Sequence, residues 1–533
     1  MKYNCNIKTL NNPKKDLKMA KCDQIPPTML VILDGFGYTA NTTGNSIAKA
    51  NMPEWTKILE NHPNTLLHAS GKYVGLPDGY IGNSEVGHTC IGAGRIIKTN
   101  FETLNELIKD ESFFLNEKLL KLFATLKQNN KPLHLIGLLS DAGVHSHIKH
   151  FFAFIKLAKQ VGVPNVYIHA ILDGRDTEEK SAETYLKKLE VFCSEQQFGK
   201  IVTLHGRFYA MDRDKNWERT EKCYNSLCGN NAKPQLWLEV LDSSYKNNVT
   251  DEFIEPTILD QECTIQDGDG IVFLNFRTDR TRQITRSFID PDFSEFKTLK
   301  KKLAFFFTIT RYDESFKKFD NEVLFEQAVI KNTLLDEISS QATNKKVFII
   351  AETEKYAHVT YFFKGKRDTQ LPHETRVLIP SIKAKTYIDH PKMSSGEITN
   401  KLIESLQTNP AYFYLVNYAN ADMVGHSGNL EATAKACEDL DMQIKKLYEE
   451  VVVKQNGTIF FTADHGNAEE MEGKHKTSHT INPVPFVICN QKNKNTKTTQ
   501  SIQKEYGIAN IAPTILEHLQ LKAPKEMLEL IPL

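Results

Sequence analysis

Short apolar runs alternate along this chain with segments of helical periodicity. Runs rich in strand-forming residues cover 28–33, 133–140, 166–172, 412–418 and 458–462. Apolar residues spaced three and four apart fill the intervals and predict helices over 101–109, 148–160, 182–193, 216–227, 332–339, 397–406 and 430–451. Strands that alternate with helices indicate an α/β fold with largely parallel sheets.

Acidic residues follow each of the five apolar runs. Asp34 follows the first run, Asp141 and Asp173 follow the next two, and Asp422 and Asp464 follow the last two. In α/β sheets, ligands bind outside the carboxyl ends of the strands. We therefore expect these carboxylates to line binding crevices.

Histidines accompany the acidic residues in the C-terminal part of the chain. Asp422 and His426 are four residues apart, and His465 directly follows Asp464. Together with Asp34, these residues offer enough oxygen and nitrogen ligands for two metal ions. Such a mixture suits manganese, zinc or cobalt better than calcium, which prefers oxygen ligands alone.

Each of these residues also has an explanation that involves no metal. Asp422 could cap a helix, and Asp464 could belong to a plain turn. The segment KHKTSHTINP contains His475 and His479. His475 lies between two lysines and is as compatible with a solvent-facing position as with a ligand, so we prefer His479.

Ser84 lies in the stretch IGNSEVGHT, residues 81–89, between Gly82 and Gly87. Flanking glycines allow the backbone to turn sharply and to approach a charged ligand closely. The chain has no G-x-S-x-G motif, so a hydrolase nucleophile elbow is excluded. A metal pair is the activator we expect for the Ser84 hydroxyl. The alternative is a serine that caps a helix or occupies a turn.

Arginines cluster in turn-like contexts in the middle of the chain. The segments DGRD, GRFYAMDR and FRTDR each follow an apolar run, and they contain Arg175, Arg207, Arg213, Arg277 and Arg280. Guanidinium groups make planar, bidentate contacts to phosphate and carboxylate. These residues could converge on one doubly anionic molecule. Alternatively, they form local pairs with the adjacent Asp176, Asp212, Asp214 and Asp279 on a solvated face.

Three further polar residues are candidates for binding. His145 and His147 follow the strand expected at 133–140, where His145 could contact a transferred group, or both could bind a metal or be exposed. Lys355 lies near the start of a helix after the apolar run 347–350, where a cation could help to hold a phosphate.

Composition excludes several classes of protein. The chain has 533 residues, enough for two or more domains, and its 66 basic and 66 acidic residues balance, so we expect no nucleic-acid or membrane partner. Nine cysteines without C-x-x-C pairs indicate reduced thiols, and we expect no structural disulfide. No run is long and apolar enough for a membrane helix. Residues 1–27 are polar and predict a disordered extension without a secretory signal.

These motifs, in this order, resemble those of the cofactor-independent phosphoglycerate mutases of the alkaline phosphatase superfamily. The resemblance spans about residue 28 to the C-terminus and includes LDGFG, IGNSEVGH, GAGRI, SDAGVHSH, LDGRD, GRFYAMDRD, FLNFRTDR, ETEKYAHVTYFF, NADMVGHSG, TADHGNAE and SHTINPVPF. It implies a phosphatase-like metal-binding domain formed by residues 28–98 and 331–533. Residues 99–330 would form an inserted phosphotransferase domain.

The resemblance also assigns roles to individual residues. It implies one metal held by Asp422, His426 and His479, and a second held by Asp34, Ser84, Asp464 and His465. Ser84 would be the nucleophile that becomes phosphoserine, and Asp176 is the preferred group for proton transfer. Substrate would be bound by His145, Arg175, Asp176, Arg207, Arg213, Arg277, Arg280 and Lys355.

Two departures from the family pattern are visible. Ala142 stands where family members commonly have glycine, and Lys364-Gly365-Lys366 replaces the usual Asn-Gly-Gly. Neither departure touches an expected ligand.

The resemblance implies reversible interconversion of 3-phosphoglycerate and 2-phosphoglycerate in glycolysis and gluconeogenesis, without 2,3-bisphosphoglycerate. We expect two divalent ions, Mn²⁺ first and Mg²⁺, Co²⁺ or Zn²⁺ as alternatives, in a cytoplasmic monomer. The alternative function is a metal-dependent phosphatase or sulfatase that uses the same metal half.

Overall fold

The computed structural model describes residues 26–229, 235–319, 321–326, 329–473, 476–495 and 502–532. It divides into two compact units. The first unit comprises the chain up to Ser70, Ile81–Arg95 and Lys331–Leu533, and the second comprises Gly71–Tyr80 and Ile96–Ile330. All but the last two residues of the predicted N-terminal extension lie outside the described residues.

Residues 71–80 and 96–98 group with the second unit, whereas the sequence-based division assigned them to the metal-binding domain. Thr99 donates its backbone N–H and its hydroxyl to the carbonyl oxygen of Gly75, at 2.9 and 3.0 Å. These bonds tie the segment 71–80 to the residues that open the second unit.

The first unit contains, among its described residues, an eight-stranded mixed sheet. Its order is β11 (Glu374–Ile379), β10 (Val347–Glu352), β12 (Phe413–Tyr418), β1 (Thr28–Leu33), β13 (Thr458–Thr462), β14 (Val484–Cys489), β2 (Asn64–His68) and β15 (Ile502–Gly507). The first five strands are parallel, and β14 is antiparallel to both neighbours. Strand β1 is buried along its whole length, which explains why it reads as a continuous apolar run.

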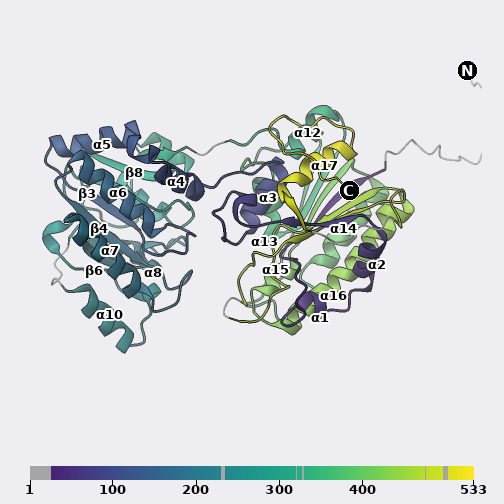
Figure 1. The fold of residues 1–533 in the computed structure, drawn as a ribbon, viewed down its shortest axis with the longest axis horizontal. Coiled ribbons are helices and arrows are strands. Elements are labelled where there is room, and N and C mark those ends of the chain that lie inside the picture. Colours follow the sequence, from purple (N-terminus) through teal and green to yellow (C-terminus); the bar gives the residue numbers. More distant parts are fainter. Residues whose placement is uncertain are drawn as a thin grey trace, which may run out of the picture. The chain divides into compact units, whose positions relative to one another are not determined.

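Helices of the first unit cover its sheet in two groups (Figure 1). One group contains α2 (Pro53–Asn61), α14 (Ser395–Thr408) and α16 (Leu430–Leu447). The other contains α3 (Ser84–Ala93), α12 (Leu334–Gln341) and α17 (Ile511–His518). The short helices α1 (Ser46–Lys49), α13 (Thr353–Ala357) and α15 (Asn420–Gly425) complete the unit.

The second unit contains, within the part of the chain that the structure describes, a seven-stranded sheet. Its order is β6 (Thr257–Ile258), β5 (Lys200–Gly206), β4 (Val166–Leu172), β3 (Leu133–Leu138), β7 (Gly270–Phe273), β8 (Phe305–Thr310) and β9 (Asn321–Phe325). All neighbours are parallel except β5 and β6. The carboxyl ends of the parallel strands therefore meet at one edge.

Two hydrophobic clusters cover the two faces of this second sheet. Leu133 and Leu135 belong to one cluster, whereas Ile136 and Leu138 belong to the other, as the alternation of side chains along a strand requires. The first cluster contains residues of α5 (Glu117–Gln128), α6 (Ile148–Val161), α7 (Ala182–Gln196) and α10 (Trp237–Lys246), together with Leu104 of α4 (Asn100–Lys109). The second contains residues of α8 (Arg207–Ala210), α9 (Trp217–Leu227) and α11 (Arg282–Ile289).

A chain of buried polar groups crosses three strands of the second sheet. His134 Nε2 lies 3.1 Å from Asp269 Oδ2, and His134 Nδ1 lies 2.9 Å from His169 Nε2. Thr203 Oγ1 lies 2.8 Å from His169 Nδ1 and 2.7 Å from His205 Nε2. If each imidazole is neutral, every hydrogen bond in the chain can form with its donor on the side away from Asp269 and its acceptor on the side nearer to Asp269. We call this set the histidine chain.

The predicted α/β class is confirmed, and the predicted helices and strands are present with ends shifted by a few residues. For example, the helix expected at 182–193 extends to Gln196, and the one expected at 430–451 ends as an α-helix at Leu447. Seven described cysteines are free. Among the described residues, no helix is long and apolar enough to cross a membrane.

Candidate active site

Three aspartates meet at the carboxyl edge of the first sheet. Asp34 directly follows β1, Asp464 lies two residues after β13, and Asp422 lies in α15 after β12. Because β12, β1 and β13 are parallel neighbours, their carboxyl ends lie side by side. All three side chains are buried, and Asp422 is the third residue of α15 rather than its N-cap.

Ser84 is the first residue of α3, and its hydroxyl faces this edge. Asn83 caps the helix by accepting a hydrogen bond from the backbone N–H of Val86 at 3.1 Å, so the capping role falls to Asn83. Ser84 Oγ lies 3.3 Å from Asp34 Oδ1 and 3.0 Å from His465 Nε2. The serine hydroxyl is therefore held among carboxylate and imidazole groups.

Both glycines that flank Ser84 are required by close packing. A Cβ at Gly82 would lie 2.1 Å from the carbonyl oxygen of Ala69, and one at Gly87 would lie 2.7 Å from the carbonyl oxygen of Asp464. Any larger residue would push α3 away from the ends of β2 and β13. The glycines thus bring Ser84 against the acidic edge.

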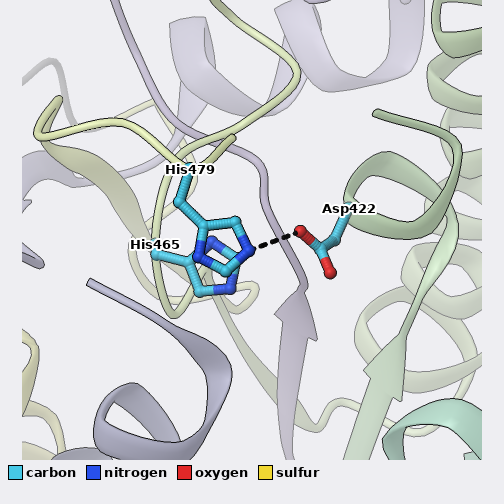
Figure 2. Close-up of side chains that lie close together, drawn as sticks. All are labelled: Asp422, His465 and His479. Atoms are coloured by element: carbon cyan, nitrogen blue, oxygen red, sulfur yellow. Dashed lines mark ion pairs between the residues drawn. The ribbon is translucent and has the colours of Figure 1, made fainter. Parts of the chain in front are cut away.

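Two groups of side chains have the spacing of metal sites. Asp34, Asp464 and His465 form one, and Asp422, His465 and His479 form the other. Figure 2 shows the second group, in which the rings of His465 and His479 stack with centroids 3.8 Å apart. His426 joins it, because the mutual distances among His426 Nε2, His479 Nε2 and Asp422 Oδ1 are 3.2 to 3.3 Å. His475 lies outside the described residues.

Each of the three imidazoles turns the same ring nitrogen toward the carboxylates. The Nδ1 atoms of His426, His465 and His479 lie 2.8, 3.3 and 2.9 Å from the carbonyl oxygens of Thr477, Gly466 and Gly82. A backbone carbonyl at Nδ1 fixes the hydrogen there and leaves Nε2 with its lone pair, which is how metal-binding histidines are oriented.

Lys355 provides the ammonium group of this cluster. It belongs to α13, which follows β10, and its Nζ lies 2.6 Å from Asp34 Oδ1, 2.6 Å from Asp422 Oδ2 and 2.8 Å from Ser84 Oγ. Burial on its own lowers the pKa of Lys355, but the adjacent carboxylates outweigh burial and raise it. Burial and the charge of Asp464 raise the pKa of Asp34 to about 7.

The donor set fits two divalent cations. Asp34, Asp422 and Asp464 bring three carboxylates around one ammonium group, and the buried Asp464 Oδ2 accepts no well-aligned hydrogen bond, although His88 Nδ1 lies 3.2 Å and His465 Nε2 3.4 Å from it. Like charges held together in a buried site are costly unless cations neutralise them. Carboxylate oxygens, aligned Nε2 atoms and a hydroxyl are ligands that first-row divalent metals accept.

Arg207 is the centre of the polar edge of the second sheet. It follows β5 directly and is buried, and its Nη1 donates to Asp173 Oδ1 and Asp176 Oδ2, both at 2.6 Å. Its Nη2 lies 3.1 Å from His145 Nε2. Burial and the charge of Arg207 lower the pKa of His145, so this imidazole is neutral and accepts from Arg207.

The other arginines of this edge are more exposed. Arg213 and Arg277 both pair with Asp279, at 2.8 and 3.3 Å, and Arg175 lies 3.4 Å from Glu252. Burial and then the charges of Arg213, Arg207 and Arg175 lower the pKa of Arg280. The local Asp–Arg pairs considered from sequence are thus present, and the cations also repel one another across one edge. An anionic ligand would relieve that repulsion.

Several residues near the two edges have roles that sequence reasoning left open or missed. His147 caps α6 by accepting from the backbone N–H of Lys149, and burial lowers its pKa to about 4. Asp173 was expected to line a binding crevice, and it accepts a hydrogen bond from Arg207 and holds that side chain in place. His88 and Asn417 contact the acidic cluster of the first unit and had no assigned role. His88 lies within the stretch 81–89, where its position one helical turn after Ser84 was the available signal.

Two family models match the chain in succession. One, described as BPG-independent PGAM N-terminus, matches residues 104–314, and another, described as Sulfatase, matches residues 310–521. With its sheet edge of aspartates, imidazoles and a serine, the chain is a member of the alkaline phosphatase superfamily.

Similar proteins show to which family of this superfamily the chain belongs. The 2,3-bisphosphoglycerate-independent phosphoglycerate mutases of Clostridium tetani and Clostridium botulinum are 44% and 45% identical over 510 residues, which are 94% of this chain and 98% of each relative. A Leishmania mexicana phosphoglycerate mutase structure at low cobalt concentration has a TM-score of 0.74 and 29% identity over 97% of this chain and 98% of that chain. The chain belongs to the 2,3-bisphosphoglycerate-independent phosphoglycerate mutases, and it is an enzyme of that family.

The departure at Lys364-Gly365-Lys366 has a structural explanation. The Lys364 side chain is buried, and its Nζ donates to the carbonyl oxygen of Thr369 at 2.6 Å and lies 3.2 Å from both carboxylate oxygens of Glu374. Lys366 adopts a φ of +63°, a conformation that glycine adopts without strain. The lysine at 364 is accommodated because β11 supplies the paired carboxylate.

Proposed function

We propose that the chain interconverts 3-phosphoglycerate and 2-phosphoglycerate through a phosphoserine at Ser84, without 2,3-bisphosphoglycerate. Family membership supports the overall reaction. The observation that carries the role of Ser84 is its position: the hydroxyl contacts Asp34, His465 and Lys355 at the edge where the carboxylates and imidazoles gather.

Two divalent ions complete this site in our proposal, with Mn²⁺ the first candidate and Mg²⁺, Co²⁺ or Zn²⁺ as alternatives. One would be held by Asp422, His426 and His479, and the other by Asp34, Ser84, Asp464 and His465. When bound, such ions lower the pKa of a hydroxyl and neutralise the charge of a phosphoryl group. The cobalt named for the Leishmania mexicana structure is consistent with a first-row divalent metal.

Residues of the first unit receive the phosphoryl group. Ser84 Oγ loses its proton and attacks phosphorus, the bond from phosphorus to the glycerate oxygen breaks, and that oxygen takes up a proton. The Lys355 ammonium group, 2.8 Å from Ser84 Oγ, stabilises negative charge on the transferred oxygens. In the second half of the reaction the other glycerate hydroxyl loses its proton and takes the phosphoryl group from Ser84.

Residues of the second unit hold the glycerate. We propose that the arginines bind its carboxylate and phosphate groups, since guanidinium groups bind both in bidentate fashion. Asp176 is our candidate for proton transfer to and from the glycerate hydroxyls, and Arg207 fixes the position of its carboxylate at 2.6 Å. From the second unit the binding set is His145, Arg175, Asp176, Arg207, Arg213, Arg277 and Arg280, and Lys355 of the first unit completes it.

The test supplies purified protein with 3-phosphoglycerate and Mn²⁺ while 2-phosphoglycerate and free phosphate are followed together. Formation of 2-phosphoglycerate without added 2,3-bisphosphoglycerate, and with little free phosphate, is the expected result. Phosphate release without 2-phosphoglycerate would replace this proposal with the phosphatase alternative. Repeating the assay with Mg²⁺, Co²⁺ and Zn²⁺ after chelation ranks the metals.

We also propose that the enzyme acts as a monomer in the cytoplasm. The free thiols of the described cysteines are typical of a reducing compartment. Light scattering coupled to size exclusion should give the mass of one chain, 60.7 kDa. After cell disruption and fractionation, the activity should be found in the cytosolic fraction. The mass of a dimer would contradict the monomer, and activity in the particulate fraction would contradict the cytoplasmic location.

A further inference from the structure

His88 lies beneath the nucleophile and is fully buried. It follows Ser84 by one turn of α3, and its Nδ1 lies 2.9 Å from the carbonyl oxygen of Ser84 and 3.2 Å from Asp464 Oδ2. Both neighbours are acceptors, so Nδ1 carries a hydrogen. The imidazole therefore donates to the backbone of the nucleophile and faces a proposed metal ligand with the same N–H.

Asn417 continues the contact on the other side of the ring. Its Nδ2 lies 3.0 Å from His88 Nε2 and 2.7 Å from Asp34 Oδ2. The contact with Asp34 requires an NH₂ group at this position, which fixes the orientation of the amide. His88 Nε2 must then be the acceptor, and His88 is a neutral imidazole with its hydrogen on Nδ1.

These contacts form a bridge between two carboxylates of one proposed metal group. It runs from Asp464 through His88 and Asn417 to Asp34, so it joins residues that follow β13 and β1. Asn417 belongs to β12 and pairs with Ile32 of β1, which places it just before the end of that strand. We call these contacts the His88–Asn417 bridge.

On Asp34 the bridge uses Oδ2 and leaves Oδ1 directed to other groups, whereas on Asp464 the oxygen that faces His88 Nδ1 at 3.2 Å, Oδ2, also faces His465 Nε2 at 3.4 Å. Asp34 Oδ1 faces Ser84 Oγ and Lys355 Nζ. The polar contacts of His88 and Asn417 are to the Ser84 carbonyl oxygen, to the two carboxylates and to each other, so the bridge acts behind the ligands and not on the transferred group. Outer contacts of this kind set the orientation and spacing of the residues that bind a metal.

We propose that His88 and Asn417 are positioning residues: together they fix the distance between Asp34 and Asp464 and hold the backbone of Ser84 to both. This inference rests on the proposed metal-dependent function. It predicts that the bridge governs the affinity of the Asp34, Asp464 and His465 group for a divalent cation, and leaves the group at Asp422, His426 and His479 unaffected.

The test measures binding of Mn²⁺ alone to metal-free protein, by the electron paramagnetic resonance signal of the free ion. His88→Leu removes both ring contacts, and Asn417→Leu removes both amide donors. We expect each to weaken one of two binding steps by about 10- to 100-fold. The double variant should lose little more than either single variant, because the bridge is already broken in each.

Two further variants of His88 test its donor contact and its acceptor contact separately. His88→Asn keeps a donor near the position of Nδ1, and His88→Gln keeps an acceptor near the position of Nε2. Both should fall between the wild type and His88→Leu in Mn²⁺ affinity. His62→Asn is the matched control, because His62 is a buried histidine of the same unit that contacts Asn493 and Tyr448 away from the site. It should bind both ions as the wild type does.

The inference would be overturned by wild-type affinity in both single variants, by additive losses in the double variant, or by equal weakening of both binding steps. A loss of affinity that follows the melting temperature of the metal-free protein across all variants, His62→Asn included, would point to general destabilisation and also contradict it. Failure of the proposed function is separate: it would appear in the wild type, as binding of fewer than two ions or as absence of mutase activity.

Discussion

The two sheets of this enzyme use the same architectural position for opposite charges. At the carboxyl edge of the first sheet lie buried carboxylates and imidazoles, and at that of the second sheet lie arginines. Parallel strands create such an edge in both cases, because their carboxyl ends point the same way. Much of the chemistry of each edge is supplied by residues that closely follow a strand, such as Asp34 after β1 and Arg207 after β5.

The difference in burial matters as much as the difference in charge. Asp34, Asp422 and Asp464 are 0–1% exposed, whereas the Arg175 side chain is 57% exposed and that of Arg213 is 48% exposed. Buried like charges suit a permanent cation, since solvent cannot screen them. Exposed arginines suit a ligand that arrives and leaves, because little desolvation is needed before it binds. Arg207, buried and held by Asp173 and Asp176, is the exception in the second unit.

The largest expected effect concerns the nucleophile. Ser84→Ala should lower the rate of isomerisation by at least about 10⁴-fold, because no other hydroxyl occupies its position. The metal-free protein should melt at an unchanged temperature, since the substitution removes one oxygen from the first residue of α3. Steady-state assays with 3-phosphoglycerate measure the loss, and appreciable residual isomerisation would remove Ser84 from its role.

The next largest effect is a loss of stability that should be large for the buried Arg207 and small for the exposed Arg175. Arg207→Met should destabilise the second unit by about 3–5 kcal/mol, because it leaves the buried Asp173 without its partner. Arg175→Met should change stability by less than about 1 kcal/mol, since its pair with Glu252 is largely exposed.

Denaturant unfolding in a Trp55→Phe background measures these changes. The two remaining tryptophans of the chain, Trp217 and Trp237, both belong to the second unit, so their fluorescence reports on it alone. Equal effects of the Arg207 and Arg175 variants would show that burial does not distinguish the two arginines.

Metal binding should stabilise one unit and not the other. At a free Mn²⁺ concentration 100 times the dissociation constant, each site adds about 2.7 kcal/mol to the free energy of unfolding. We expect this gain in the first unit, where the carboxylates gather. Trp55 fluorescence in a protein that carries Trp217→Phe and Trp237→Phe follows that unit during thermal unfolding, with and without a chelator. A Mn²⁺-dependent rise in melting temperature confined to the second unit would contradict the assignment of the metal sites to the first unit.

The smallest expected effect is the share of a single buried histidine in the acid sensitivity of the second unit. Burial lowers the pKa values of the histidine chain, to about 3 for His205, whereas an unfolded histidine titrates near 6.5. Above about pH 6.5 both states are neutral, and below it only the unfolded state binds protons. Stability should therefore fall as the pH drops from about 6.5, by up to about 1.4 kcal/mol per pH unit for each histidine.

His205→Gln tests this origin of the acid sensitivity. The variant should show a shallower loss of stability between pH 7 and pH 5 in the Trp55→Phe background, whatever its stability at pH 7. A pH dependence as steep as that of the parent protein would exclude His205 as one of the groups responsible.

Much of the fold could be predicted because its strands are buried on both faces. A continuous apolar run followed by an acidic residue, as at Asp34 and Asp464, identifies both the strand and the edge at which it ends. The roles of individual ligands came from the resemblance to a family, since an isolated Asp422 or His426 has explanations that involve no metal.

Contacts between distant segments could not be predicted in the same way. The His88–Asn417 bridge joins α3 to β12, and no spacing along the chain indicates that pairing. The histidine chain depends on the register of β3, β4 and β5, which places His169 opposite Thr203. Residues 71–80 group with the second unit, where Gly75 bonds to Thr99 and Tyr80 packs on Phe101, and these contacts have no sequence signal.

The most direct test of the central claim is to observe the phosphoryl group on Ser84 during turnover. Protein loaded with Mn²⁺ is mixed with 3-phosphoglycerate, quenched in acid within the first turnover, digested and analysed by mass spectrometry. We predict that the peptide containing Ser84 gains one phosphoryl group, which disappears as substrate is exhausted and is absent in Ser84→Ala. Formation of 2-phosphoglycerate with the phosphoryl group on another residue, or on none, would contradict the account.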